Sequence, residues 1–415
     1  MVGAVKKLLF VSNGHGEDAE ASHIARALRQ SGLPVEMEAV AIVGEGRAYQ
    51  NAGVPIVGPT FTPVSGGFTY MNRSLLLDDI RAGLLGAAFG QLRAVRKRAA
   101  SCDLVLATGD EYGQFFAYMS KRPFISFIAP LSANYTGTLK ADLILQWIIR
   151  SRRCLSVVTR DQLTARSLIA QGYPKIAYGG NPSVDFLTPS GADLSLAPGD
   201  TVIGLLPGSR VPEAERNLLL QMRFVAEVAK RLAETGDPRR LAFRAALVPS
   251  VMEAVPRLAE QAGWRLEGRF LKLTADGIDA EIGVHADAFP DILHAATLVV
   301  AMAGQASDQA LALGKPSFMF AGGGPQFTWR FAEAQYRYHG GLSVLVGDGP
   351  ADDALLGEAA ARLLAVLDDR AYLDRVAELG PERVGSRGSA GRFVDIIAGH
   401  LGFGSSIGPK DAHEG

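Results

Sequence analysis

The sequence contains too few of several residue types to fit some common protein classes. Among its 415 residues there are only two cysteines, Cys102 and Cys154, which excludes a disulfide framework and a cysteine-ligated zinc site. Lys plus Arg (42) and Asp plus Glu (43) nearly balance. The resulting net charge of −1 gives no global reason to expect nucleic acid as a partner, and leaves room only for a local basic patch.

Long apolar runs are also missing. No uncharged stretch approaches the ~18–20 residues that a helix needs to span a bilayer. Residues 1–7 lack the apolar core and the small-residue cleavage site of a signal peptide. We therefore expect a cytoplasmic protein, free to touch a membrane from that side.

Core residues, in contrast, are abundant. Hydrophobic residues make up 48% of a chain too long for one ordinary core, which predicts a soluble protein of two domains. The stretch 186–200 is rich in proline and glycine and is the best linker candidate. We expect domains at 1–187 and 201–388, a linker at 188–200, a helix at 389–402 that packs back on the first domain, and a disordered tail at 403–415.

Short apolar strands alternate with helical spacers along both halves, which predicts parallel sheets covered on both faces. In the first half we expect strands at 8–12, 35–43, 103–108, 124–129 and 156–159, with a helix at 18–30. In the second half we expect strands at 201–206, 241–248, 298–302 and 317–320, and helices over 218–232, 353–367 and 391–400. The fold class is thus α/β, with two Rossmann-like domains facing a cleft.

Two of the apolar runs end in a glycine turn that leads into a helix. The turns lie in KLLFVSNGHGED at 7–18 and in VIGLLPGSR at 202–210. A strand, a glycine turn and a helix point backbone N–H groups and the positive end of the helix dipole at one spot, which favours anions. Two such units indicate a phosphate-binding or acceptor-binding site in each half.

The first turn carries candidate acid and base groups. His15 or Glu17 would act as acid or base, whereas the plainer interpretation is that acidic residues only complement the helix dipole. Asp110 ends another apolar strand and would accept a proton from a sugar hydroxyl, or would only cap the next helix. The candidate contacts to an acceptor or sugar here are Asn13, Gly14, Gly16, Asp18 and Glu111.

The second half offers a candidate phosphate site. Arg210 follows Gly208 and Ser209 and suits a diphosphate, unless it only pairs with Glu213 or Glu215. A further turn would bring a phosphate or a ribose close to the backbone, or would only pack tightly. Its candidate residues are Gly304, Gln305, Ala306, Ser307, Asp308 and Gln309. In the loop at 322–326, Gln326 would contact a sugar, or the loop would only connect two elements without binding a ligand.

Two segments are candidates for contact with a membrane surface, and the first has the pattern of a helix. Residues 73–98 carry an apolar stripe and end in a basic cluster, Arg93, Arg96, Lys97 and Arg98. Such a helix would dock on an anionic membrane or a lipid acceptor, or would only pack on the sheet. The stretch 143–158, with Trp147 and three arginines, is a second candidate for the same surface.

Several of these motifs occur together in one family. LLPGSR at 205–210 resembles a signature of lipid-A-disaccharide synthase. GNPSVD at 180–185 is similar to that family's turn between domains, with Asn181 in place of His, and GQASDQ at 304–309 matches its donor turn, with Gln309 in place of Glu. SNGHGED at 12–18 and GPQFT…FAEAQ at 324–335 resemble the lipid-A-disaccharide synthase-related branch. The resemblance extends to about His400.

The resemblance implies a GT-B glycosyltransferase with no cofactor and no metal. The donor would be a UDP-sugar (UDP-GlcNAc-like or UDP-acylglucosamine), and the acceptor would be lipid-linked at a membrane surface. The family's catalytic Asp would fall on Asp110 and its phosphate-site Arg on Arg210. The reaction would invert the anomeric centre. Two other functions stay open, a UDP-sugar 2-epimerase with the same two-domain plan and a non-catalytic nucleotide-sugar-binding protein.

Overall fold

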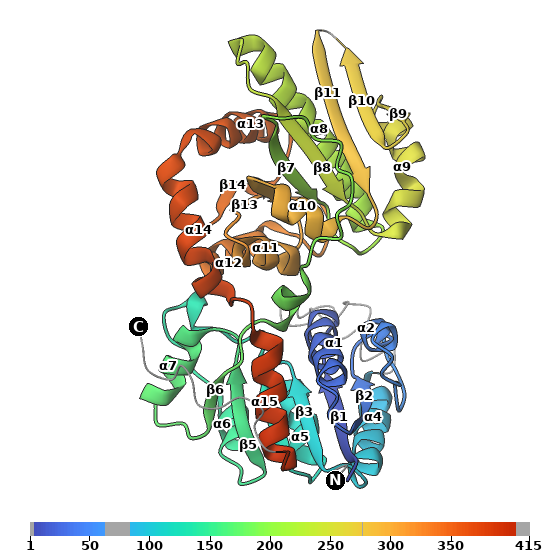
Figure 1. Ribbon diagram of the computed structural model, residues 1–415, viewed down its shortest axis with the longest axis vertical. Coiled ribbons are helices and arrows are strands. Elements are labelled where there is room, and N and C mark those ends of the chain that lie inside the picture. Colours follow the sequence, from blue (N-terminus) through green and yellow to red (C-terminus); the bar gives the residue numbers. More distant parts are fainter. Residues whose placement is uncertain (1–3, 63–83, 276, 404–415) are drawn as a thin grey trace. The chain divides into compact units, whose positions relative to one another are not determined.

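A computed structural model describes residues 4–62, 84–275 and 277–403. The chain forms two compact units, Met1–Phe186 with Gly385–Gly415, and Leu187–Val384. Figure 1 shows the two sheets with their helices, coloured along the sequence.

Unit 1 is built on a parallel sheet in the order β2-β1-β3-β4-β5-β6. Its strands are β1 (Lys6–Ser12), β2 (Val35–Ala41), β3 (Leu104–Thr108), β4 (Phe124–Phe127), β5 (Cys154–Thr159) and β6 (Ile176–Tyr178). Its helices are α1 (His15–Gln30), α2 (Arg47–Asn51), α4 (Leu84–Ala99), α5 (Glu111–Met119), α6 (Leu143–Ile149), α7 (Gln162–Ala170) and α15 (Ser389–Leu401), with short 3-10 turns at η1 (Ala133–Tyr135) and η2 (Pro182–Phe186).

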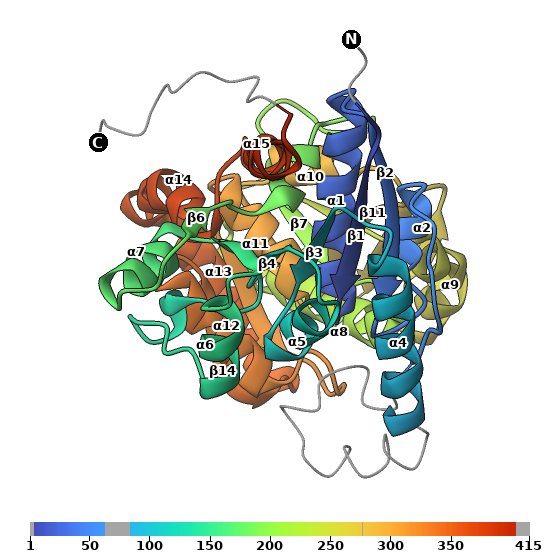
Figure 2. The same cartoon turned by 90° about the horizontal axis from the view of Figure 1, so that it is seen from below.

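Alternate residues of β1 supply the two faces of this sheet. Leu8 and Phe10 enter one core with α1 and α15, and Leu9 and Val11 enter a second core with α4, α5 and α6. The view in Figure 2 shows these two helix layers on opposite sides of the strands. Because both faces are covered, the strands are almost continuously apolar, as expected for a buried parallel sheet.

The C-terminal helix α15 belongs to unit 1. Phe393 is fully buried against Phe127 of β4, with ring centroids 4.7 Å apart. The carboxylate of Asp185 accepts hydrogen bonds from the backbone N–H groups of Gly388 and Ala390, both at 2.5 Å, at the start of the helix. An acidic group at a helix N-terminus is favourable, so Asp185 anchors the returning chain.

Unit 2 is built on a sheet in the order β14-β13-β12-β7-β8-β11-β10-β9. Its strands are β7 (Thr201–Leu206), β8 (Leu241–Ala246), β9 (Arg265–Glu267), β10 (Phe270–Ala275), β11 (Ile278–His285), β12 (Leu298–Ala301), β13 (Ser317–Ala321) and β14 (Val344–Pro350). Its helices are α8 (Glu213–Thr235), α9 (Pro249–Gln261), α10 (Phe289–Ala295), α11 (Gly304–Ala312), α12 (Trp329–His339), α13 (Asp353–Asp368) and α14 (Arg370–Val384).

The second sheet is mixed, and the expectation of a purely parallel sheet is wrong at one edge. β10 pairs antiparallel with both β9 and β11. The connections are only a few residues long and contain Gly268 and Gly277, both with positive φ, whereas a parallel pair needs a crossover. The sequence signal was the alternation of apolar and polar residues at 270–275.

The proline-rich stretch after residue 186 is fixed within unit 2. Asp291 of α10 accepts hydrogen bonds from the backbone N–H groups of Ser190 (3.1 Å), Gly191 (2.7 Å) and Ala192 (3.0 Å). Burial opposes ionisation of Asp291, but these bonds together outweigh it and lower its pKa. The chain therefore passes between units at 186–187 and 384–385, before and well after this segment.

The predicted strands and helices are present, with shifted ends. α1 begins at His15 and not at residue 18, so Gly16, Glu17 and Asp18 lie in its first turn. The second candidate for a membrane surface, residues 143–158, comprises α6 and most of β5. Of the predicted helix 73–98, residues 73–83 lie outside the described part and 84–98 fall in α4. The predicted tail, apart from Phe403, also lies outside the described residues.

Candidate functional site

Asn13 and Asp110 are brought together at the carboxyl edge of the unit 1 sheet. β1 and β3 are neighbours, so the residues that follow Ser12 and Thr108 leave the sheet side by side. Asn13 Nδ2 donates to Asp110 Oδ1 at 2.6 Å. Asp110 is also the N-cap of α5, since Oδ1 accepts from the backbone N–H of Tyr112 at 2.9 Å. The side chain is only half-buried, so the capping role leaves it accessible.

Asp18, predicted to contact a sugar, is enclosed behind this edge. It is 2% exposed, and its Oδ1 accepts from Ser12 Oγ at 2.5 Å. Ser12 Oγ also lies 2.8 Å from the hydroxyl of fully buried Tyr49. Burial raises the pKa of Asp18 to about 7, against the hydrogen bond from Ser12, which lowers it. Asp18 thus belongs to a buried polar network, and its contact with a sugar stays a prediction.

The other candidates at this edge differ in exposure. His15 is exposed, and its imidazole lies against Gly44, which has a φ of +78° and leaves no room for a Cβ. Glu17 is half-buried and its carboxylate folds back over Gly14, the N-cap of α1. Among the described residues, apart from its chain neighbours and the backbone of its own helix, nothing lies within 4 Å of where a Cβ of Gly16 would be. Glu111 is half-buried, and burial raises the pKa of its carboxyl group.

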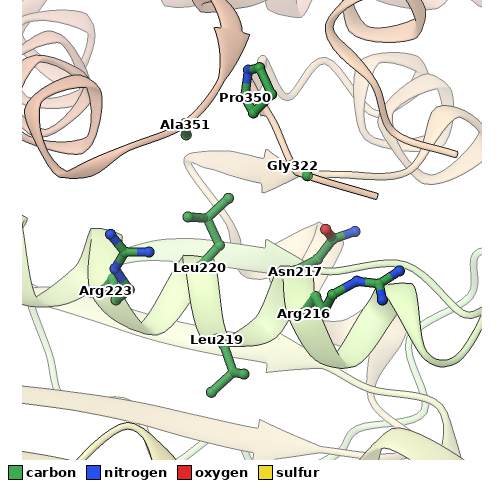
Figure 3. A pocket seen from close by; sticks show the side chains of 9 residues that line it. Arg216, Asn217, Leu219, Leu220, Arg223, Gly322, Pro350 and Ala351 are labelled. Carbon is green, nitrogen blue, oxygen red and sulfur yellow. The ribbon is translucent and has the colours of Figure 1, made fainter. Parts of the chain in front are cut away.

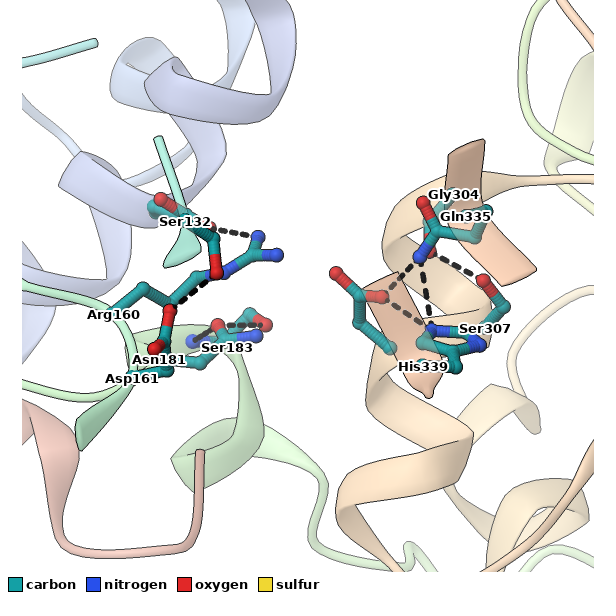
Figure 4. Close-up of polar contacts among 11 residues, drawn as sticks. Ser132, Arg160, Asp161, Asn181, Ser183, Gly304, Ser307, Gln335 and His339 are labelled. Carbon is teal, nitrogen blue, oxygen red and sulfur yellow. Dashed lines mark hydrogen bonds and ion pairs between the residues drawn. The ribbon is translucent and has the colours of Figure 1, made fainter. Parts of the chain in front are cut away.

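Asn181, the remaining unit 1 candidate, lies in a buried polar cluster. It is 1% exposed, and its Oδ1 accepts from the backbone N–H and the hydroxyl of Ser183 at 3.1 and 2.7 Å. Figure 4 shows it beside Asp161, which caps α7 and accepts from Ser132 Oγ at 2.7 Å. Nearby, Arg160 pairs with buried Glu20 at 3.6 Å. No sequence pattern points to Asp161, Arg160 or Glu20.

In unit 2 the turn after β7 presents Arg210. Gly208 has a φ of +103°, a conformation that favours glycine, and Ser209 is exposed. The guanidinium of Arg210 donates to Gln326 Oε1 at 3.5 Å, so two predicted contacts, one after β7 and one after β13, lie together. Of the two proposed acidic partners of Arg210, Glu215 pairs with Arg257.

Glu213 organises the loop that carries Gln326. It is 3% exposed and accepts from the backbone N–H groups of Gln326, at 2.9 and 3.1 Å, and Phe327, at 2.7 Å. A Cβ on Gly324 would collide with its side chain at 2.5 Å. Asn217, one turn later, donates to the carbonyl of Pro207 at 2.9 Å. Glu213 is therefore a structural carboxylate that ties α8 to the loop, a role that sequence reasoning missed.

The predicted donor turn forms the start of α11. β12 pairs with β7, so the turn before Gly304 lies beside the turn that carries Arg210. Gly304, Gln305, Ala306 and Gln309 are half-buried, and Ser307 is buried with its hydroxyl donating to the carbonyl of Gly304 at 2.7 Å. Ala303 caps the helix without a side-chain hydrogen bond, so the first N–H groups of the helix have no side-chain cap.

Asp308, one turn into α11, joins a buried network with α12. Its Oδ1 lies 2.9 Å from Nε2 of His339, which is fully buried, and it accepts from Gln335. Nε2 of Gln335 and Nε2 of His339 are themselves 3.0 Å apart, and Figure 4 shows these two side chains pointing toward each other. This network holds the start of α11 against α12, and the predicted contact of Asp308 with a ribose stays a prediction.

Two shallow pockets lie on the separate units. In unit 2 a pocket of about 260 Å³ lies between Arg216 and Arg223 of α8 and the backbone at Gly322 and Ala351 (Figure 3). In unit 1 a pocket of about 420 Å³ is lined by Tyr118, Leu143, Gln146, Trp147, Arg150 and Ser151. Beside it, Leu143 is 82% and Trp147 55% exposed.

The described residues contain neither a candidate metal site nor a membrane-spanning helix. Within residues 4–62, 84–275 and 277–403 there is no group of three or more His, Cys, Asp and Glu side chains arranged to hold a metal ion. Nor does any helix in those ranges combine the length and the apolar character that crossing a bilayer requires.

Comparison with known proteins gave matches among solved structures only. No protein-family model and no curated protein matches the sequence. The calicheamicin glycosyltransferase CalG4 is similar with a TM-score of 0.61 and 14% identity, over 98% of this chain and 100% of its own. S. aureus MnaA, solved with UDP, is similar with a TM-score of 0.57 and 14% identity, over 99% of this chain and 100% of the MnaA chain. UDP-GlcNAc 2-epimerase of Neisseria meningitidis, bound to UDP-GlcNAc, is similar with a TM-score of 0.52 and 14% identity, over 95% of this chain and 99% of the epimerase chain.

At such identities the similarity concerns the fold. It confirms the predicted fold class, two Rossmann-like α/β units of the GT-B type. Both glycosyltransferases and 2-epimerases are among the similar structures, and nothing in the comparisons singles out lipid-A-disaccharide synthases.

Proposed function

We propose that the chain is a glycosyltransferase that uses a nucleoside diphosphate sugar held by unit 2. The observation that carries the proposal is the meeting of three turns at the carboxyl edge of the second sheet. β12 pairs with both β7 and β13, and Arg210 after β7 contacts Gln326 after β13. Ligands of open α/β sheets bind at this edge.

The charges at this edge suit a diphosphate. Arg210 supplies a permanent positive charge, and the start of α11 supplies backbone N–H groups and the positive end of a helix dipole. Both would stabilise the negative charge that builds on the leaving diphosphate. In this proposal they do so without a metal ion, so transfer should persist in EDTA.

Asp110 of unit 1 would act as the general base. The acceptor hydroxyl attacks the anomeric carbon while the bond from that carbon to the diphosphate oxygen breaks. The hydroxyl proton passes to the Asp110 carboxylate and the UDP leaves with the bonding electrons. A single displacement of this kind inverts the anomeric centre. His15 is exposed and Glu17 half-buried at the same edge, so each is an alternative base.

The donor and acceptor are proposed in finer terms. The donor would be UDP-GlcNAc-like or a UDP-acylglucosamine, and the acceptor lipid-linked, as in lipid-A-disaccharide synthases. Support for a membrane surface comes from α6, where Leu143, Ile144 and Trp147 are exposed beside Arg150 and Arg152. Apolar side chains flanked by arginines suit the interface of an anionic membrane.

The first experiment is a calorimetric titration with UDP, UDP-GlcNAc, UDP-glucose and ADP. We expect uridine-selective binding that falls at least tenfold in Arg210→Ala, because one charge-assisted contact is worth about 1.5–3 kcal/mol. Arg231→Ala is the matched control, since Arg231 is an exposed arginine at the other end of α8. Absence of uridine binding in the wild type would refute the proposal.

A UDP-sugar 2-epimerase is the second candidate, supported equally by the similarity to the Neisseria enzyme. An epimerase changes the sugar without an acceptor and keeps its bond to UDP, whereas a transferase releases UDP only when an acceptor is present. Proton NMR of UDP-GlcNAc with the protein alone separates the two. UDP affinity with no turnover of either kind would indicate a non-catalytic binding protein.

Vesicle sedimentation tests the membrane surface. We expect the protein to sediment with vesicles of phosphatidylglycerol and not with vesicles of phosphatidylcholine. The double variant Leu143→Ser, Trp147→Ser should lose this binding. Ile169→Ser is the control, since Ile169 is 59% exposed on α7 of the same unit. Equal binding of both variants would exclude α6 as the contact.

A further inference from the structure

The side chain of Asn13 is fixed against the turn after β3. Its Nδ2 donates to Asp110 Oδ1 at 2.6 Å, and only the amide nitrogen can do so, because a carboxylate is an acceptor. With the amide reversed, its oxygen would face the carboxylate oxygen and repel it. The charge of Asp110 therefore sets the orientation of Asn13.

Two glycines make room for this amide. A Cβ on Gly109, whose φ is +147°, would overlap Asn13 Oδ1, and a Cβ on Gly113 would lie 2.7 Å from it. Asn13 Oδ1 is buried there with no hydrogen-bond partner among the residues that the structure describes. A buried unpaired acceptor costs about 1–3 kcal/mol, and such a group in a folded protein calls for an explanation.

We propose that Asn13 is a positioning residue that selects which oxygen of Asp110 accepts the acceptor's proton, an inference that rests on the function proposed above. Asp110 Oδ1 receives two hydrogen bonds, from Asn13 Nδ2 and from the backbone N–H of Tyr112. Oδ2 makes no hydrogen bond or ion pair with the residues at 4–62, 84–275 and 277–403, and the side chain is half-buried, so Oδ2 is the oxygen left to face an acceptor hydroxyl. The unpaired amide oxygen is the energetic cost of this arrangement.

A change of one atom in Asn13 tests the contact without any substrate. Asn13→Asp keeps the shape but replaces the donor by a second carboxyl group next to Asp110. Two carboxyl groups at this distance repel each other when both are ionised, so one of them keeps its proton to a higher pH than an isolated carboxyl group. We expect the carboxyl ¹³C signal of Asp110, assigned by its loss in Asp110→Asn, to titrate with a midpoint at least about one pH unit above that of the wild type.

Asn51→Asp is the matched control, because it makes the same chemical change at an exposed position that ends α2. Its Asp110 signal should titrate as in the wild type. If Asn13→Asp does not fold, Asn13→Ser removes the amide donor without adding a charge. It should also raise the midpoint of the Asp110 titration, by a smaller amount. An unchanged midpoint in a folded Asn13 variant would overturn the proposal.

Binding and turnover separate this proposal from the function it rests on. UDP affinity should stay within about twofold of the wild type in Asn13→Ser, because the donor residues belong to unit 2. With UDP-GlcNAc and a detergent-solubilised lipid extract, UDP release should show kcat lowered at least about tenfold and an unchanged KM for the nucleotide sugar. A wild type that fails to bind UDP refutes the glycosyltransferase, while the carboxyl titration still decides the role of Asn13.

Discussion

Replacing Asp18 by Asn should stabilise unit 1 at neutral pH and leave it unchanged in acid. Burial raises the pKa of Asp18 from 3.8 to about 7 in the folded protein. A carboxyl whose pKa is raised by folding contributes its stability fully below pH ~4, and that contribution is lost as pH rises through ~7. Asn mimics the protonated acid and still accepts from Ser12 Oγ, so the variant avoids the loss.

The size of the effect follows from the pKa difference. About three pH units correspond to ~4 kcal/mol, which is the most that the variant can gain over the wild type between pH 4 and pH 8. His23 works in the opposite direction, because burial lowers its pKa to about 4 and its contribution is lost as pH falls. That contribution is the same in both proteins, so only the difference between them isolates Asp18.

The assay should report on unit 1 separately, because a chain of two units need not unfold in one step. Pulse-labelling hydrogen exchange in urea, read on peptides of α1 and β1 at pH 5 to 8, gives the free energy of unfolding of this unit. Glu36→Gln is the control, since Glu36 is exposed and should give a flat difference. A wild-type minus Asp18→Asn difference that varies by less than ~1 kcal/mol over this range would mean that Asp18 ionises normally in the folded protein.

Three further substitutions test contacts that hold loops and turns in place in the two units. Glu213→Gln should destabilise unit 2 by about 1.5–3 kcal/mol in urea unfolding, since the amide turns an N–H toward the backbone donors of Gln326, and no loss would contradict its role. Asp291→Ala should expose residues 187–200 to thermolysin, and unchanged cleavage would show that other contacts hold this segment. Gly109→Ala should lower the melting temperature by several degrees, because the φ of residue 109 is +147° and the added Cβ would overlap Asn13. A melting temperature equal to that of the wild type would show that the space between residue 109 and Asn13 can widen.

The local pattern was enough to predict most of the elements but not their pairing at the second sheet's edge. Strand and helix periods depend on near neighbours, so the strand at 201–206 and the helix at 353–367 are both present. The antiparallel β10 and β11 are missing from the expected strands, because the alternation of apolar and polar residues at 270–275 is a weaker signal than the continuous apolar runs of the buried parallel strands. α1 begins three residues before the predicted start at residue 18, because Gly16 lies in the first turn of the helix and not in the loop before it.

Buried carboxylates were the hardest residues to interpret. Asp18 and Asp308 are predicted ligand contacts because each follows a glycine turn at the end of an apolar strand. The structure encloses Asp18 behind Ser12 and Tyr49, and joins Asp308 to His339 of a helix about 30 residues away. Partners so distant along the chain leave no local periodic signal, so only the fold identifies them.

Asp110 shows why a structural and a functional interpretation of one residue need not compete. Capping α5 occupies one carboxylate oxygen, through the backbone N–H of Tyr112 at 2.9 Å. Asn13 donates to the same oxygen, so both of these structural contacts fall on Oδ1. A cap fixes the carboxylate rigidly, and a general base needs such a fixed direction toward its proton. If Asp110 is the base that we propose, the helix cap is the contact that fixes its direction.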